Sequence, residues 1–176
     1  SSPVIHEGRV IVQCDVQKDS FLAVFDLADG RELWRTPRGD VPTWSTPAVV
    51  TTPGRTQIVV NGWRETGGYD FATGRKLWTL DGGGDIPVPT PIFAHGLIHL
   101  TSAHGNFRPL RAIRPDAAGD ITPEDPGRTN AAPCRRSWSC SSARRATISG
   151  VVTHFRCGAR RHVPDPEHGA STSTPS

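Results

Sequence analysis

Residues 25–34 read FDLADGRELW and residues 69–78 read YDFATGRKLW, so one decamer recurs after 44 residues. The Ser/Thr-Pro pairs that end at Pro3, Pro47 and Pro91 have the same spacing. Two independent markers with one spacing indicate an internal repeat, and periods of roughly 20 to 50 residues are typical of arrays of small structural units. A third, degraded copy occupies residues 112–121, where no Trp follows Gly119.

Each repeat unit predicts short strands separated by turns. Runs of β-branched and aromatic residues bounded by Gly, Pro and Asp favour strands, and no segment has a helical period. The predicted strands are 4–5, 9–16, 21–26 and 32–36 in the first unit, 47–51, 57–61, 68–70 and 76–80 in the second, and 90–93, 97–102 and 110–113 in the third. The fold class expected is all-β, with just under three four-stranded repeats of 44 residues.

The decamer predicts a tight hairpin that delivers a Trp. A type I turn followed by a left-handed residue favours Gly in the last position, where Gly30 and Gly74 lie. Four-stranded sheets of this kind bury their faces by stacking on one another, and Trp34 and Trp78 are large enough to fill the space between neighbours. Each unit is therefore expected to be a propeller blade.

The decamers resemble the tryptophan-docking motif of the pyrroloquinoline-quinone (PQQ) type β-propeller repeats. The matching residues are Asp26, Gly30 and Trp34 in the first copy and Asp70, Gly74 and Trp78 in the second. The resemblance covers residues 1 to about 122 and includes the Ser/Thr-Pro openings and the Ala-Ile-Arg-Pro stretch at 112–115. It departs from the motif at Val24 and Gly68, where the family usually has Ala. The resemblance implies a bacterial protein that is exported, for instance to the periplasm.

A closed propeller needs roughly four to eight blades, and this chain supplies fewer than three full units. We therefore expect a longer native protein, of which the sequence is an incomplete propeller. The sequence contains no Met and no charged-then-apolar leader, which also indicates that the start is missing. Uncovered blade faces predict poor solubility or self-association. No apolar run is long enough for a membrane-spanning helix.

The last part of the chain differs from the repeats in composition. Residues 1–127 hold 12 basic and 15 acidic side chains, whereas residues 128–176 hold 8 and 2, so the net charge of +3 arises from the tail. We divide the chain into partial propeller repeats at 1–123 and a tail at 124–176. The tail is expected to be disordered, or to be a GC-rich gene segment read in the wrong frame.

The tail also contains residues that could bind metal or nucleic acid. Soft metal ligands are available at Cys134, Cys140, His154, Cys157 and His162, but their spacing does not match that of established zinc sites. Arginines occur at 135, 136, 144, 145, 160 and 161, with only Trp138 and Phe155 interleaved as aromatic residues. Both functions are less favoured than the disordered or frameshifted tail, and no nucleic-acid partner is expected.

Two tryptophans lie outside the decamers. Trp44 and Trp63 are interpreted as blade-packing residues, with contact to a ligand or partner as the alternative, since Val88 replaces Trp44 in the next unit. The glycine run at 81–85 is interpreted as a flexible connection between blades rather than a calcium or phosphate loop. His95, His99 and His104 are interpreted as surface or satisfied histidines.

The sequence contains no nucleophile elbow, phosphate loop or His-Glu-x-x-His motif, so no catalytic residue, bound metal or cofactor is predicted. The favoured hypothesis is a non-catalytic PQQ-like propeller that acts as a recognition or scaffold platform for protein partners, similar to the outer-membrane assembly propeller lipoproteins. Two alternatives remain. One is a fragment of a quinoprotein dehydrogenase, although the adjacent cysteines of that family are absent, and the other is a propeller with a metal- or nucleic-acid-binding tail.

Overall fold

The fold is all-β, as the repeat predicts. A computed structural model describes residues 1–102, 109–123, 147–148 and 151–152, and every regular element in these ranges is a strand. The first sheet has the order β1-β2-β3-β4. Its strands are β1 (Val4–His6), β2 (Arg9–Cys14), β3 (Phe21–Asp26) and β4 (Glu32–Pro37).

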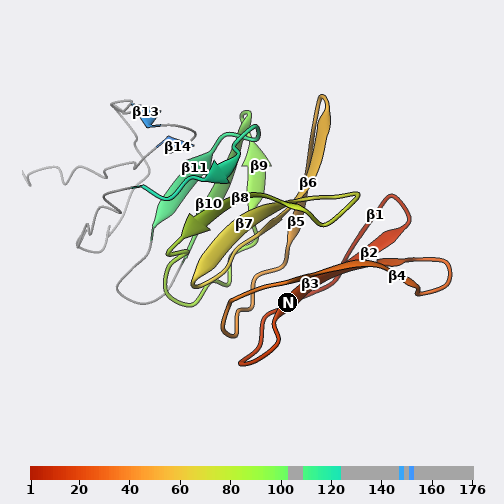
Figure 1. The fold of residues 1–176 in the computed structure, drawn as a ribbon. Helices are drawn as coiled ribbons and strands as arrows, with labels where there is room; N and C mark the ends of the chain where they lie inside the picture. The colour runs from red at the N-terminus through yellow and green to blue at the C-terminus, as the bar shows by residue number, and fades with distance from the viewer. Residues whose placement is uncertain (103–108, 124–146, 149–150, 153–176) are drawn as a thin grey trace, which may run out of the picture.

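The second sheet repeats this four-stranded antiparallel meander and adds one strand at its edge, whereas the third has three strands of the meander and adds two. The second sheet contains β5 (Ala48–Thr52), β6 (Arg55–Val60), β7 (Glu65–Asp70) and β8 (Lys76–Asp81). The third contains β9 (Ile92–Ala94), β10 (Leu97–Thr101) and β11 (Leu110–Ile113). We call the three sheets blades 1, 2 and 3. They follow one another along the chain, and the array is open rather than closed into a ring (Figure 1).

The decamers form the turns between the third and fourth strands of blades 1 and 2. Gly30 and Gly74 have φ angles of 74° and 73°, in the left-handed region that favours glycine. In each turn the Gly amide donates to the carbonyl of the leading acid, Asp26 or Asp70, over 2.9 Å. The side chain of Asp70 also accepts hydrogen bonds from the Thr73 hydroxyl and amide, which lower the pKa of this carboxyl.

Trp34 links blade 1 to blade 2. Its indole Nε1 donates to the carbonyl of Phe71, 3.2 Å away, and its ring lies directly against Gly74, where a Cβ would clash with the six-membered ring. Thr36 Oγ1 also donates to the Gly74 carbonyl over 2.8 Å. The glycine of the second decamer therefore has two roles, because it permits the turn and leaves room for the Trp of the preceding blade.

Trp78 occupies the corresponding place in blade 2 and is only 1% exposed. Its Nε1 donates to Gln57 Oε1 over 2.8 Å, and Gln57 Nε2 donates to the carbonyl of Pro115 over 2.8 Å. Pro115 lies 44 residues after Phe71 and is therefore its equivalent in the next unit. Trp34 hydrogen-bonds directly to the carbonyl of Phe71, whereas Trp78 reaches the carbonyl of Pro115 through the side chain of Gln57. Gly68 makes this possible, since a Cβ there would clash with the indole of Trp78.

Two apolar clusters lie between the blades. The first joins Ile11, Leu22 and Val24 of blade 1 to Ile58, Val60, Tyr69 and Phe71 of blade 2. The second joins Val50, Val59, Trp78 and Leu80 of blade 2 to Ile98, Leu100, Ile113, Ala117 and Ile121. Blade 2 is therefore covered on both faces.

The third unit departs from the repeat after β11. Its left-handed glycine is Gly119, one residue later than the spacing of 44 requires. The next strand, β12 (Gly119–Asp120), pairs in parallel with β8 of blade 2 instead of returning along β11. The degraded copy thus contributes a fifth strand to blade 2, which fits the loss of the Trp that would hold this strand in blade 3.

Two short strands from the tail complete the edge of blade 3. The strand β14 (Val151–Val152) pairs with β11, and β13 (Thr147–Ile148) pairs with β14. The remainder of 124–176 lies outside the described residues. The division at residue 123, and the interpretation of the tail as disordered or frameshifted, stay predictions.

Candidate recognition surface

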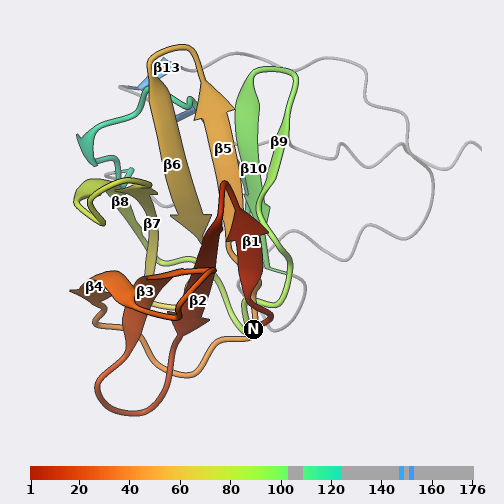
Figure 2. The same ribbon diagram turned by 90° about the vertical axis from the view of Figure 1, so that its right-hand side faces the viewer.

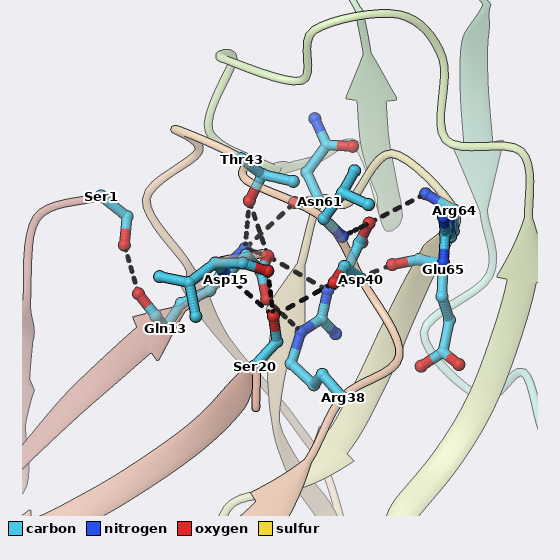
Figure 3. Close-up of polar contacts among 12 residues, drawn as sticks. Ser1, Gln13, Asp15, Ser20, Arg38, Asp40, Thr43, Asn61, Arg64 and Glu65 are labelled. Carbon is cyan, nitrogen blue, oxygen red and sulfur yellow. Dashed lines mark hydrogen bonds and ion pairs between the residues drawn. The ribbon is translucent and has the colours of Figure 1, made fainter. Parts of the chain in front are cut away.

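A buried ionic cluster lies at one end of blades 1 and 2, where the chain crosses between them. Arg38, just after β4, donates from Nε to Asp15 Oδ1 over 2.8 Å and from Nη2 to Asp40 Oδ2 over 3.2 Å. All three side chains are almost fully buried. A third bond runs from Arg38 Nη1 to the Tyr69 hydroxyl of blade 2, 2.9 Å away. Figure 3 shows Arg38 between the two aspartates.

The charges in this cluster support one another. Burial alone would lower the pKa of Arg38, but the Tyr69 oxygen and the carboxylates of Asp15 and Asp40 more than offset it and raise that pKa. Burial also raises the pKa of the Tyr69 phenol, so the hydroxyl stays protonated and donates to Glu65 Oε1 over 3.0 Å. Removing either the cation or one of the carboxylates from such a buried group is strongly destabilising, because the remaining charge is left without its partner.

The cluster fixes the loops above it. Asp40 Oδ1 accepts from the amides of Val41 and Arg64 over 2.8 and 3.0 Å, which ties the linker between blades 1 and 2 to the β6–β7 loop. A Cβ at Gly62 would clash with Asp40, and a Cβ at Gly83 would clash with the Gly62 carbonyl. The glycine run at 81–85 is thus packed closely against the β6–β7 loop, where the sequence had suggested a flexible connection.

A surface of exposed apolar side chains lies on these fixed loops. Trp44, in the first linker, is 55% exposed, and Trp63, in the β6–β7 loop, is 41% exposed. Ile86 and Val88 of the second linker are exposed as well. We call Trp44, Trp63, Ile86 and Val88 the linker surface.

Backbone hydrogen bonds join the three segments of the linker surface. The Trp44 amide donates to the Pro87 carbonyl over 3.2 Å, and the Gly83 amide donates to the Trp63 carbonyl over 3.1 Å. The guanidinium of Arg64 lies 5.7 Å from the centroid of the Trp63 ring. The surface therefore presents two accessible indoles and one adjacent cation on a backbone that is held in place from below.

A row of buried amides runs beneath the same end of the blades. Gln13 Nε2 of β2 donates to the carbonyl of Asn61 over 3.1 Å, and Asn61 Nδ2 donates to the carbonyl of Thr101 over 3.0 Å. The strand register makes Gln13, Asn61 and Thr101 equivalent positions of the three blades. Arg9 pairs with Asp26 in blade 1 as Gln57 pairs with Asp70 in blade 2, so residue 13 corresponds to residue 61. Ile58 pairs with Tyr69 in blade 2 as Ile98 pairs with Ile113 in blade 3, so residue 61 corresponds to residue 101. Each blade thus hydrogen-bonds to the next at one repeated position.

The motif residues singled out in the sequence do not contribute to the linker surface. Asp26, Gly30, Asp70 and Gly74 form turns at the opposite end of the blades, and Trp34 and Trp78 lie between blades. Of the aromatic residues outside the decamers, Trp44 and Trp63 do reach this surface. Sequence reasoning did not identify Arg38, Asp15 or Asp40. Their only signal in the sequence is the charged pair Arg38 and Asp40, at the start of the linker between blades 1 and 2.

The other candidates do not converge on a site. His95 lies in the exposed β9–β10 turn with a φ of 52°, and a ring nitrogen of His99 lies 3.2 Å from the Ala94 carbonyl. His104, the five tail residues proposed as metal ligands and the six tail arginines lie outside the described residues. Within the part of the chain that is described, no three His, Cys, Asp or Glu side chains gather as a metal site would require, and no helix has the length and apolar character to cross a membrane.

The fold and this surface define an open array of propeller-type β-blades. No protein-family profile matches the chain, and no curated protein matches it. Among solved structures, the crystal structure of BamB from Moraxella catarrhalis is similar, with a TM-score of 0.46 and 17% identity. The match covers 63% of this chain and 35% of BamB, so the chain spans about a third of that protein. Membership of the PQQ-like repeats remains a prediction from the decamers.

Proposed function

We propose that the chain is a non-catalytic recognition or scaffold module that binds protein partners through the linker surface. The observation that carries this proposal is the exposure of Trp44 and Trp63 on loops fixed by the Arg38 cluster. Tryptophan is enriched among the residues that dominate protein–protein binding energy, and rigid loops reduce the entropy lost on binding. Arg64 beside Trp63 adds a cation that a partner carboxylate can pair with.

Binding by the linker surface can be tested with a peptide library of random 12-residue sequences displayed on phage and selected against the chain. We expect the selected peptides to bind the wild-type chain and to lose at least about tenfold in affinity in Trp44→Ala and Trp63→Ala variants, which is about 1.4 kcal/mol each. Leu27→Ala is the matched control, because Leu27 is also an exposed apolar residue but lies in the turn at the opposite end of blade 1. Selected peptides that bind both Trp variants as well as the wild type would refute the proposal.

A further inference from the structure

Ile86, in the second linker between β8 and β9, has a backbone conformation that isoleucine rarely adopts. Its φ angle is 47°, in the left-handed region, where a β-branched side chain clashes with its own backbone. The following Pro87 adds to the strain, because a residue before proline favours extended conformations. The other non-glycine residues with positive φ in the described ranges are Glu7, Asp19 and His95. None of these is β-branched, and all lie in turns between antiparallel strands.

The connection between two blades does not require a strained residue at this point. The two linkers have the same length, because the decamer Trp residues before them and the Ser/Thr-Pro pairs after them are each 44 residues apart. The strands on both sides keep this spacing in their register. Pro42 occupies the place of Ile86 in the first linker, and its ring holds φ at about −65°. The left-handed conformation is therefore particular to the second linker.

Burial in the core does not compensate for the strain either. Ile86 is 39% exposed and belongs to neither of the two apolar clusters. Hydrogen bonds on both sides hold its backbone, since the Asp85 carbonyl accepts from Ser102 Oγ and the Pro87 carbonyl accepts from the Trp44 amide. Strained residues persist where the surrounding structure holds them, and they cluster at sites of ligand contact.

We propose that Ile86 is a specificity-determining residue of the linker surface, and that the chain gives up stability to present this side chain to a partner. The inference rests on the proposed protein-binding function. An apolar side chain of the partner that covers Ile86 removes apolar surface from water, whereas a polar side chain there is buried without a hydrogen-bond partner. Ile86 therefore selects partners that carry an apolar residue at the matching place.

The cost in stability can be measured with Ile86→Gly. This change removes the Cβ that causes the strain, so the urea midpoint of unfolding should rise, although glycine lowers stability at an ordinary backbone position. Val88→Gly is the matched control, because Val88 lies in the same linker, is 51% exposed and does not have a positive φ. Its midpoint should fall. A fall of similar size in both variants would overturn the proposal.

The contact with a partner can be measured with the phage-selected peptides described above. Ile86→Ala retains the Cβ, and with it the left-handed strain, but loses the rest of the side chain. Its affinity for the peptides should fall at least about tenfold, as for a residue that dominates binding. Ile86→Val, which stays β-branched and loses one methyl group, should retain most of the affinity. Isothermal titration calorimetry provides the dissociation constants.

A double-mutant cycle identifies the peptide residue that Ile86 selects. Each apolar residue of the tightest peptide is replaced by Ala in turn, and every peptide is titrated against the wild-type and Ile86→Ala chains. For one peptide position, the replacement should weaken binding to the wild type but cause little further loss with Ile86→Ala, because that contact is already absent. Losses that add at every position would overturn the proposal.

The Trp variants separate this proposal from the proposed function. Weakened binding by Trp44→Ala and Trp63→Ala together with wild-type affinity in Ile86→Ala would overturn the role of Ile86 and leave binding by the linker surface intact. Wild-type affinity in all three variants would overturn both.

Discussion

Glycine 74 is the residue on which the blade 1–blade 2 contact depends most directly. Its backbone is left-handed, and the Trp34 ring fills the space where a side chain would begin. Gly30 has the same φ, but no atom lies within 4 Å of the position of its Cβ. A comparison of substitutions at the two glycines therefore separates the effect of backbone strain from the effect of displacing the Trp34 ring.

We expect Gly30→Ala to cost about 1–2 kcal/mol of unfolding free energy through left-handed strain alone. Gly74→Ala should cost about 1–3 kcal/mol more, because the methyl group displaces the Trp34 ring. Urea unfolding of both variants, followed by tryptophan fluorescence, measures the difference. Equal losses would mean that Trp34 does not rest on this glycine in solution.

Arg38 is the second residue with a large expected effect. Arg38→Met leaves Asp15 and Asp40 buried without their cation, and we expect a loss of about 3–5 kcal/mol. Arg35→Met is the control, since Arg35 forms an exposed pair with Glu32, worth about 0–1 kcal/mol. Thermal unfolding of the two variants side by side provides the measurement, and losses of similar size would contradict the assignment of Arg38 as a buried cation.

At the scale of elements, the hairpins and their Trp residues could be predicted from the sequence because their signals are local. A glycine four residues after an acid and a Trp four residues later define the turn and the strand without knowledge of the rest of the chain. The Arg38 cluster could not be predicted, since Asp15 and Arg38 are 23 residues apart and Tyr69 comes from another blade. The exposure of Trp44 and Trp63 depends on those same non-local contacts, so the sequence left two interpretations open.

The path of β12 is the other element that sequence reasoning did not predict. A repeat with a spacing of 44 places the residues after the third turn back along β11, but one extra residue precedes Gly119 and no Trp follows it. Pairing with β8 lets the Ile121 amide donate to the Thr79 carbonyl over 2.9 Å and places Ile121 in the apolar cluster beside Trp78.

The Trp78 side chain packs in the apolar cluster between blades 2 and 3. Trp78→Ala should cost about 3–5 kcal/mol, because the cavity lies in a cluster that the surrounding strands cannot easily fill. Trp34→Ala should cost less, since Trp34 is only half-buried. Equilibrium unfolding in urea measures both losses, and a loss below about 1 kcal/mol for Trp78→Ala would count against a docking role.

For the whole molecule, stability should be greatest in the middle. Among the described residues, both faces of blade 2 pack in apolar clusters, whereas blades 1 and 3 each contribute one face to those clusters. Arrays of this kind open from their ends.

Amide hydrogen exchange followed by mass spectrometry should show this gradient. Amides of β6 and β7 should exchange at least about tenfold more slowly than those of β2 and β3. Equal exchange across the two blades would indicate that the array unfolds as one cooperative unit.

The loop between the second and third strands differs in length among the blades although the strands around it superpose in register. In blade 1, Gln13 pairs with Leu22, which lies nine residues later in the chain. The equivalent residues of blade 2, Asn61 and Thr66, are only five residues apart. Four residues have been gained or lost at this point, while the hydrogen bonds of the amide row are kept from blade to blade. The long loop between β2 and β3 projects at the bottom of Figure 2. This loop in blade 2 also carries Trp63. The chain therefore offers a natural grafting position in blade 1, where a foreign binding sequence could be inserted at 16–19 to give this end of the blades a new specificity without altering the amide row or the Arg38 cluster.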